Sequence, residues 1–194
     1  MDIAAWRREV RSRLIEERLG MTPKIRQHVT IAIEGLLDQV LDPVPPQILS
    51  AYLPYKGEVD LRPFLFRLNE KGWSTALPAV ERRGLPLKFL RWTADSEMET
   101  GAFGIPIPRI HDVVVPGVML LPLVAFDTRN YRLGYGAGYF DITLASLVPR
   151  PLTIGIGFEL SRLETIYPLP TDIPLDFIVT EAGIQKSGDD HRVL

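Results

Sequence analysis

The feature that most constrains this chain is a set of apolar runs that are almost continuous rather than alternating. The stretch Gly117–Phe126 is nearly all apolar and stops at Asp127, and LTIGIGF at 152–158 and DFIVTE at 176–181 have the same character. A strand with one face in water alternates apolar and polar residues, whereas a strand covered on both faces does not. Because helical segments separate these runs, we predict an α/β fold with a mostly parallel sheet and helices on both faces.

Two helices are expected before the first strand. Apolar residues recur at helical spacing over residues 3–18, with arginines between them, and Gly20 ends the segment. Thr22 and Pro23 have the pattern of an N-cap and a first turn, and the periodicity then continues to Asp42. The remaining expected elements are strands at 48–55, 73–80 and 87–92, helices at 61–68 and 139–147, and a polar tail at 182–194.

Size and composition limit the class of protein. The 194 residues fit a single domain spanning 1–194, and the absence of cysteine excludes a disulfide-built secreted domain, a thiolate zinc site and a cysteine nucleophile. A net charge of −2 provides no overall basic field for nucleic acid. The longest apolar stretch is short and interrupted by prolines, so it does not suit a bilayer. We expect a cytoplasmic monomer that binds neither nucleic acid nor membrane.

The segment RLGYGAGYFD at 132–141 is the clearest candidate for a ligand site. Its glycines at 134, 136 and 138 stand between a strand and an expected helix, where α/β proteins collect ligands. Backbone N–H groups of such a loop can approach a phosphate closely, and the helix N-terminus adds partial positive charge. Neither the Walker A nor the dinucleotide pattern is present. On composition alone, a plain glycine-rich turn is slightly favoured over a phosphate site.

Together with its neighbours, the string LPLVAFDTRNYRLGYGAGYFD closely resembles the signature of the 5-formyltetrahydrofolate cyclo-ligase (5,10-methenyltetrahydrofolate synthetase) family. An arginine-rich first helix, then LPYKGEVD, FGIPIP, IGIGF and PLDFIVTE, follow in the family's order, so the resemblance covers nearly the whole chain. It implies a Rossmann-like α/β fold. It also implies conversion of 5-formyltetrahydrofolate to 5,10-methenyltetrahydrofolate with ATP and Mg²⁺, which releases ADP and phosphate.

The resemblance also implies roles for individual residues. For ATP binding it selects Arg7, Arg11, Arg132, Gly134, Tyr135, Gly136, Ala137, Gly138, Tyr139 and Phe140. For catalysis it selects Tyr139 and Arg132, for the folate substrate Leu53, Glu58 and Phe103, and for the metal Asp141 and Asp172.

Most of these assignments have an ordinary alternative. The first-helix arginines could form a solvated surface, as we expect for Arg8 and Arg13. Glu58 could be a turn residue, and Phe103 a core residue. Asp141 could instead stabilise only the N-terminus of the following helix by its negative charge. We expect Asp176 to cap or orient the last strand.

Two departures from the family pattern leave the function open in part. Many members have a lysine in the loop or an arginine after the motif aspartate, whereas this chain has Ala137 and Ile142. Near Asp172, the family often has polar residues of other types where this chain has Glu159, Ser161 and Thr171. Two alternatives therefore remain, a cyclo-ligase-like paralogue acting on another cofactor-related substrate and a non-catalytic binder of folate or nucleotide.

Overall fold

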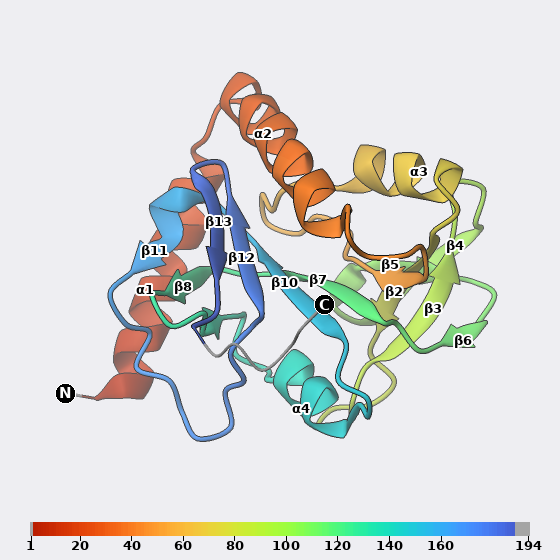
Figure 1. Ribbon diagram of the computed structural model, residues 1–194. Coiled ribbons are helices and arrows are strands. Elements are labelled where there is room, and N and C mark those ends of the chain that lie inside the picture. Colours follow the sequence, from red (N-terminus) through yellow and green to blue (C-terminus); the bar gives the residue numbers. More distant parts are fainter. Residues whose placement is uncertain (1, 189–194) are drawn as a thin grey trace.

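A large mixed sheet forms the centre of the computed structural model, which describes residues 2–188 (Figure 1). Its strand order is β13-β12-β10-β7-β1-β2-β3-β6. The strands are β1 (Ile48–Ser50), β2 (Ser74–Ala79), β3 (Lys88–Trp92), β6 (Val113–Val114), β7 (Val118–Pro122), β10 (Leu152–Ile156), β12 (Phe177–Thr180) and β13 (Gly183–Lys186). The five strands from β12 to β2 run parallel, and β3, β6 and β13 pair antiparallel. The predicted mostly parallel α/β sheet is confirmed.

Helices cover both faces of this sheet. The α-helices of the described residues are α1 (Ile3–Leu19), α2 (Pro23–Leu41), α3 (Arg62–Glu70) and α4 (Tyr139–Ser146), and the last three cover the main sheet. Helices α2 and α3 lie on one face, and α4 lies on the other, where Leu144 joins Met119 and Leu121 in one apolar cluster (Figure 1). As predicted, two helices precede β1, and Thr22 caps α2 by accepting a hydrogen bond from the backbone N–H of Ile25.

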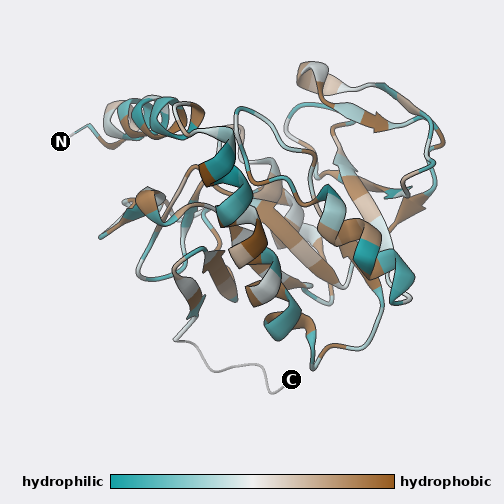
Figure 2. Cartoon of the chain, turned by 90° about the horizontal axis from the view of Figure 1, so that it is seen from above, coloured by the Kyte–Doolittle hydropathy of each residue, from teal (hydrophilic) through white to brown (hydrophobic). Residues whose placement is uncertain are grey.

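Hydropathy follows these layers. The strands at the centre are coloured as hydrophobic, whereas α1 and α2 carry strongly hydrophilic segments (Figure 2). None of the described helices is long and apolar enough to cross a membrane.

The apolar run 117–126 was predicted as one strand but forms two. Strand β7 ends at Pro122, and β8 (Ala125–Asp127) belongs to a separate sheet with β9 (Arg132–Leu133) and β11 (Arg162–Leu163). The chain leaves the main sheet at Leu123, whose Cδ1 occupies space that a Cβ on Gly157 would need, at 2.2 Å. A proline supplies no backbone donor, which makes this a favourable place to end pairing. The apolar pattern of residues 117–126 gave no sign that the strand would end at Pro122.

Helix α1 covers this smaller sheet rather than the main one. Its apolar residues Val10 and Leu14 cluster with Val124, Ala125 and Leu133. The turn that follows β8 is held by the fully buried Asp127, whose Oδ1 accepts hydrogen bonds from backbone N–H groups of the turn and whose Oδ2 accepts one from Ile166. The fold thereby brings the face of α1 and the glycine segment together.

Two segments contain strands that the sequence did not predict. The connection after β3 contains β4 (Met98–Thr100), which pairs with β5 (Pro106–Pro108) around the short helix η1 (Ala102–Gly104). The expected polar tail begins instead with edge strand β13, and residues 189–194 lie outside the described part of the chain. An edge strand can be polar because one of its faces meets solvent. A second short helix, η2, spans Glu159–Ser161.

Candidate active site

A cavity of about 1040 Å³ lies beyond the carboxyl ends of β1, β2 and β7. Every residue that the sequence analysis assigned to a site contributes to its lining: Arg7, Arg11, Leu53, Glu58, Phe103, Arg132, Gly134, Tyr135, Gly136, Ala137, Gly138, Tyr139, Phe140, Asp141 and Asp172. The fold therefore gathers residues from α1, from the segment after β1, from η1, from the glycine loop and from the segment before β12.

The glycine loop, defined here as residues 134–138, follows β9 and leads directly into α4, as predicted. Gly136 (φ +101°) and Gly138 (φ +69°) adopt backbone conformations that residues with side chains rarely take. A Cβ on Gly134 would lie 2.8 Å from Nη1 of Arg132, and one on Gly136 would lie 3.4 Å from Cζ of Arg11. Gly134 thus allows the guanidinium of Arg132 to lie against the loop, whereas Gly136 is required by its backbone conformation.

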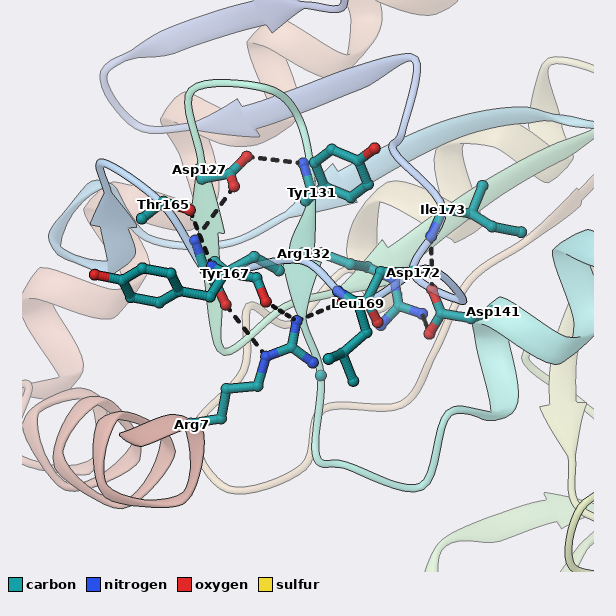
Figure 3. Close-up of polar contacts among 12 residues, drawn as sticks. Arg7, Asp127, Tyr131, Arg132, Asp141, Thr165, Tyr167, Leu169, Asp172 and Ile173 are labelled. Atoms are coloured by element: carbon teal, nitrogen blue, oxygen red, sulfur yellow. Dashed lines mark hydrogen bonds and ion pairs between the residues drawn. The ribbon is translucent and has the colours of Figure 1, made fainter. Parts of the chain in front are cut away.

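Arg7 anchors one end of the cavity. Its guanidinium is ion-paired with Asp172 and donates to the carbonyl oxygens of Ile166 at 3.2 Å and Tyr167 at 3.1 Å (Figure 3). The same carboxylate of Asp172 accepts a hydrogen bond from the backbone N–H of Leu169 at 2.7 Å. Arg7 is buried, so the alternative of a solvated helix surface is wrong for this residue.

Arg132 forms a second buried ion pair. Its Nη2 lies 3.0 Å from Oδ2 of Asp141 (Figure 3). Its guanidinium also lies over the ring of Phe140, at 5.1 Å from the centroid. Burial lowers the pKa of Arg132, and the neighbouring Asp141 opposes that shift. Within the described residues, Nε of Arg132 is a buried donor with no hydrogen-bond partner. Because such a donor is costly, it favours an anionic ligand at this position.

Arg11 connects α1 to the glycine loop. Its Nε donates to the carbonyl oxygen of Gly134 at 2.7 Å. Burial and the neighbouring charge of Arg7 lower the pKa of Arg11. Arg8 and Arg13 are exposed, as expected. Three cationic side chains, those of Arg7, Arg11 and Arg132, therefore meet beside the loop and form what we call the basic end of the cavity.

The two metal candidates are engaged by arginines rather than grouped as a closed metal centre. Asp141 also accepts a hydrogen bond from the backbone N–H of Ile173 at 3.3 Å. Among the described residues there is no group of three or more His, Asp and Glu that could hold a metal ion. Mg²⁺ is often bound by only one or two carboxylates together with substrate phosphates and water. The donor set therefore fits an ion that arrives with a nucleotide.

Glu58 lines a second part of the cavity, which we call the carboxylate end. Its Oε1 accepts a hydrogen bond from the hydroxyl of Tyr135 at 2.8 Å, and its Oε2 accepts one from the backbone N–H of Tyr55 at 2.9 Å. Burial raises the pKa of Glu58 to about 7, although these hydrogen bonds and the charge of Arg18 oppose the shift. Glu58 is thus not an ordinary solvated turn residue.

Aromatic residues enclose the space between the two ends. Phe103 is 68% exposed, its backbone has φ +58°, and its ring centroid lies 6.3 Å from that of Tyr139 at an interplanar angle of 63°. The alternative that Phe103 is a core residue is therefore wrong. Leu53 lines the same space and is half-buried.

The sequence analysis missed two polar residues near Glu58. Arg18 is only 2% exposed and donates from Nη2 to the Tyr135 hydroxyl at 2.7 Å. Tyr52 lines the cavity, and its buried hydroxyl has no hydrogen-bond partner among the described residues. Arg18 could have been found from its spacing, because positions 7, 11 and 18 share one helix face with Leu14.

Asp176 lies outside the cavity lining and acts as expected, by orienting the last parallel strand. Its Oδ2 accepts hydrogen bonds from the backbone N–H and hydroxyl of Thr153, and its own backbone N–H donates to that hydroxyl at 3.0 Å. These bonds join the start of β12 to β10.

A mostly parallel α/β sheet with a large cavity beyond the carboxyl ends of its strands, lined by apolar residues and a few buried charged groups, is typical of a ligand-binding site in an enzyme. The sequence matches the model of the 5-formyltetrahydrofolate cyclo-ligase family over residues 3–181, and the chain belongs to that family. The prediction of an enzyme of the ligase class, forming a C–N bond, is confirmed with it.

Individual relatives agree with this assignment over nearly their full length. The chain is 27% identical to the 5-formyltetrahydrofolate cyclo-ligase of Escherichia coli K12, covering 87% of this chain and 97% of the relative. It is also 27% identical to the Mycoplasma pneumoniae cyclo-ligase, covering 89% and 96%. The solved structure of Aquifex aeolicus 5,10-methenyltetrahydrofolate synthetase superposes with a TM-score of 0.81 at 29% identity, covering 97% and 96%.

Proposed function

We propose that this protein converts 5-formyltetrahydrofolate to 5,10-methenyltetrahydrofolate in a reaction that consumes ATP and requires Mg²⁺. The observation that carries the proposal is the division of one cavity into a basic end and a carboxylate end. The first suits a polyphosphate, and the second suits a heterocycle that donates hydrogen bonds. The printed names of the relatives support the folate substrate.

The chemistry explains why both ends are needed. A formamide oxygen is a poor leaving group, so the γ-phosphoryl group of ATP is first transferred to that oxygen and ADP is released. The N10 amine of the folate then attacks the formyl carbon and loses its proton, and the C–O bond breaks as inorganic phosphate departs. Phosphoryl transfer of this type depends mainly on positioning and charge stabilisation.

At the basic end, we assign the triphosphate to Arg7, Arg11, Arg132 and the backbone of the glycine loop. The Nε of Arg132 supports this assignment because it is a buried donor that no described residue satisfies. Arg132 and Tyr139 are the residues proposed to face the transferred phosphoryl group, while Phe140 walls the nucleotide site. Gly134, Tyr135, Gly136, Ala137 and Gly138 supply the loop.

Asp141 and Asp172 would hold Mg²⁺, which neutralises phosphate charge when bound with the nucleotide. Each carboxylate now pairs with an arginine, so nucleotide binding would exchange partners: the arginines turn to phosphate oxygens and the carboxylates to the ion. Such an exchange keeps every buried charge compensated, which is the condition for placing charges in a low-dielectric site.

At the carboxylate end, Glu58 would accept hydrogen bonds from N–H groups of the pterin. Leu53 and Phe103 would contact the ring system, since flat aromatic surfaces pack well against a heterocycle. We also propose that the protein is a cytoplasmic, single-domain monomer without a nucleic-acid partner. These points rest on the length and composition of the sequence.

The test is the spectrophotometric appearance of the methenyl product from 5-formyltetrahydrofolate, ATP and Mg²⁺, with each reactant omitted in turn. Turnover that requires all three supports the proposal. Thermal stabilisation by folate and nucleotide without turnover would favour a non-catalytic binder. Stabilisation by nucleotide alone would favour a paralogue with another substrate.

A further inference from the structure

Tyr135 belongs to the glycine loop, yet its side chain contacts Glu58 at the carboxylate end of the cavity. Its hydroxyl donates to Oε1 of Glu58 at 2.8 Å and also lies 3.2 Å from the carbonyl oxygen of Tyr55. Its ring packs edge-on against that of Tyr55, with centroids 5.5 Å apart. The backbone of the residue is thus part of the proposed phosphate loop, while its hydroxyl is part of the carboxylate end.

The direction of this hydrogen bond is set by Arg18. Its guanidinium donates to the Tyr135 hydroxyl at 2.7 Å, so the hydroxyl oxygen acts as an acceptor there. Its single proton then has two acceptors within reach, of which Oε1 of Glu58 at 2.8 Å is nearer than the carbonyl oxygen of Tyr55 at 3.2 Å. Burial and the neighbouring Glu58 raise the pKa of Tyr135, which keeps that proton in place.

Arg18 is itself held rigidly. It is almost completely buried, and it donates from Nε to the carbonyl oxygen of Lys56 at 3.0 Å and from Nη1 to that of Leu123 at 3.2 Å. These carbonyls belong to the loop before Glu58 and to the point where the chain leaves the main sheet. Arg18 therefore fixes the hydroxyl of Tyr135 relative to both.

The backbone next to Tyr135 is tied to the basic end. The carbonyl oxygen of Gly134 accepts a hydrogen bond from Arg11, and Gly136 has a left-handed conformation against the same guanidinium. A phosphate that draws Arg11 towards itself would change this contact and, with it, the placement of Tyr135. One residue thus connects the proposed nucleotide contacts to the carboxylate of Glu58.

We propose that Tyr135 is a positioning residue that couples the two ends of the cavity, so that binding of nucleotide and binding of folate strengthen each other. This inference rests on the proposed function, because it assumes these two ligands. Coupling of this kind is reciprocal, and its usual size corresponds to about 5–150-fold in affinity.

The test uses Tyr135→Phe, which removes only the hydroxyl, and Tyr131→Phe as a matched control. Tyr131 lies outside the cavity lining, and its ring packs with the apolar cluster of α1. The affinity of 5-formyltetrahydrofolate is measured by calorimetry, with and without Mg²⁺ and a non-hydrolysable ATP analogue. We expect the analogue to tighten folate binding about fivefold or more in the wild type and in Tyr131→Phe. In Tyr135→Phe the gain should fall below about twofold.

The pH dependence of folate affinity is the second measurement, which a merely structural role would not change. The groups facing Glu58 are Arg18 on α1, Tyr52 after β1 and Tyr135 on the glycine loop. The Tyr135 hydrogen bond lowers the pKa of Glu58, so removing the hydroxyl should raise it further and move the midpoint of folate binding to higher pH.

The outcomes separate this inference from the proposed function. If the wild type binds both ligands independently, or if Tyr135→Phe keeps the full gain and the same midpoint, the inference is wrong and the proposed function stands. If the wild type binds neither ligand, the proposed function itself fails.

Discussion

The basic end and the carboxylate end of the cavity handle charge in opposite ways. At the basic end, Arg7 and Arg132 are each paired with an aspartate. At the carboxylate end, Glu58 is buried against neutral donors, and its pKa is raised to about 7. The first arrangement can exchange partners when charged ligands arrive. The second can accept a hydrogen bond from a ligand, and the ionisation of Glu58 depends on pH.

The comparison predicts the largest loss for the basic end. Asp141→Asn should lower kcat/KM for Mg²⁺-ATP about hundredfold, because it removes a charge needed beside the phosphates. The asparagine oxygen can still accept the hydrogen bond from Arg132, so the free energy of unfolding should fall by only about 1–3 kcal/mol. Steady-state kinetics and chemical denaturation measure the two effects.

Asp95→Asn, at an exposed position, is the matched control and should change neither quantity. If the activity of Asp141→Asn falls only as much as its loss of stability accounts for, Asp141 only stabilises the start of α4.

At the carboxylate end, Glu58→Gln should weaken folate binding about tenfold to a hundredfold at high pH and leave nucleotide affinity nearly unchanged. The amide keeps the shape of the carboxylate but loses its charge and part of its acceptor capacity. Calorimetric titration with each ligand measures the split. Glu70→Gln, on the exposed end of α3, is the control, and unchanged folate affinity in Glu58→Gln would refute the contact.

The raised pKa of Glu58 makes two pH predictions with opposite signs. Its pKa rises from 4.5 to about 7 on folding, so the folded state holds more protons in that window and stability falls as pH rises through it. Folate binding needs the carboxylate, so affinity should rise by up to about tenfold per pH unit below 7 and level off above. Glu58→Gln should remove both dependences, as denaturation and titration across this range would show.

Gly136→Ala tests the loop between the two ends. The positive φ of Gly136 makes any side chain strained, although the new Cβ would meet Arg11 only at an ordinary van der Waals distance of 3.4 Å. We expect a loss of about 1–3 kcal/mol in unfolding free energy, read from denaturant midpoints. The same exchange at Gly35, which lies exposed inside α2 with open space around it, should instead stabilise by up to about 1 kcal/mol. Equal effects at the two sites would contradict the loop argument.

The smallest expected effect is a gain. Ala137→Lys adds a cation to the glycine loop at an exposed position that lines the cavity. An exposed charge contact contributes about 0.2–1 kcal/mol, so nucleotide affinity should rise by no more than about fivefold. Ala182→Lys, in the turn before β13, is the control, and calorimetry in low and high salt measures the gain. A loss of affinity would show that the loop has no room for the side chain.

Much of the fold was predictable because its signals are local. Continuous apolar runs identified the parallel strands, and the Thr22-Pro23 pair located the start of α2. The division of the run 117–126 was not predictable. It depends on how Leu123 packs against Gly157, which follows the end of β10, and a pattern read along one segment does not contain that contact.

The same distinction applies to the site. The residues of the glycine loop could be selected because they form one continuous motif. The positions of Arg18 and Tyr135 are 117 apart in sequence, and the direction of the tyrosine side chain depends on a buried guanidinium that looked like one more arginine of a basic helix. Local periodicity predicts which face a residue is on, but it does not predict which long-range partner it finds.

The separate packing of α1 has a practical consequence. Its apolar residues cluster with the small sheet and not with the main core, while its other contacts bring Arg7 and Arg11 to the cavity. Local opening of such an element costs less than global unfolding. A preparation can therefore keep its melting transition and still have lost the proposed nucleotide contacts, which makes catalytic assay, rather than melting temperature, the proper measure of storage quality.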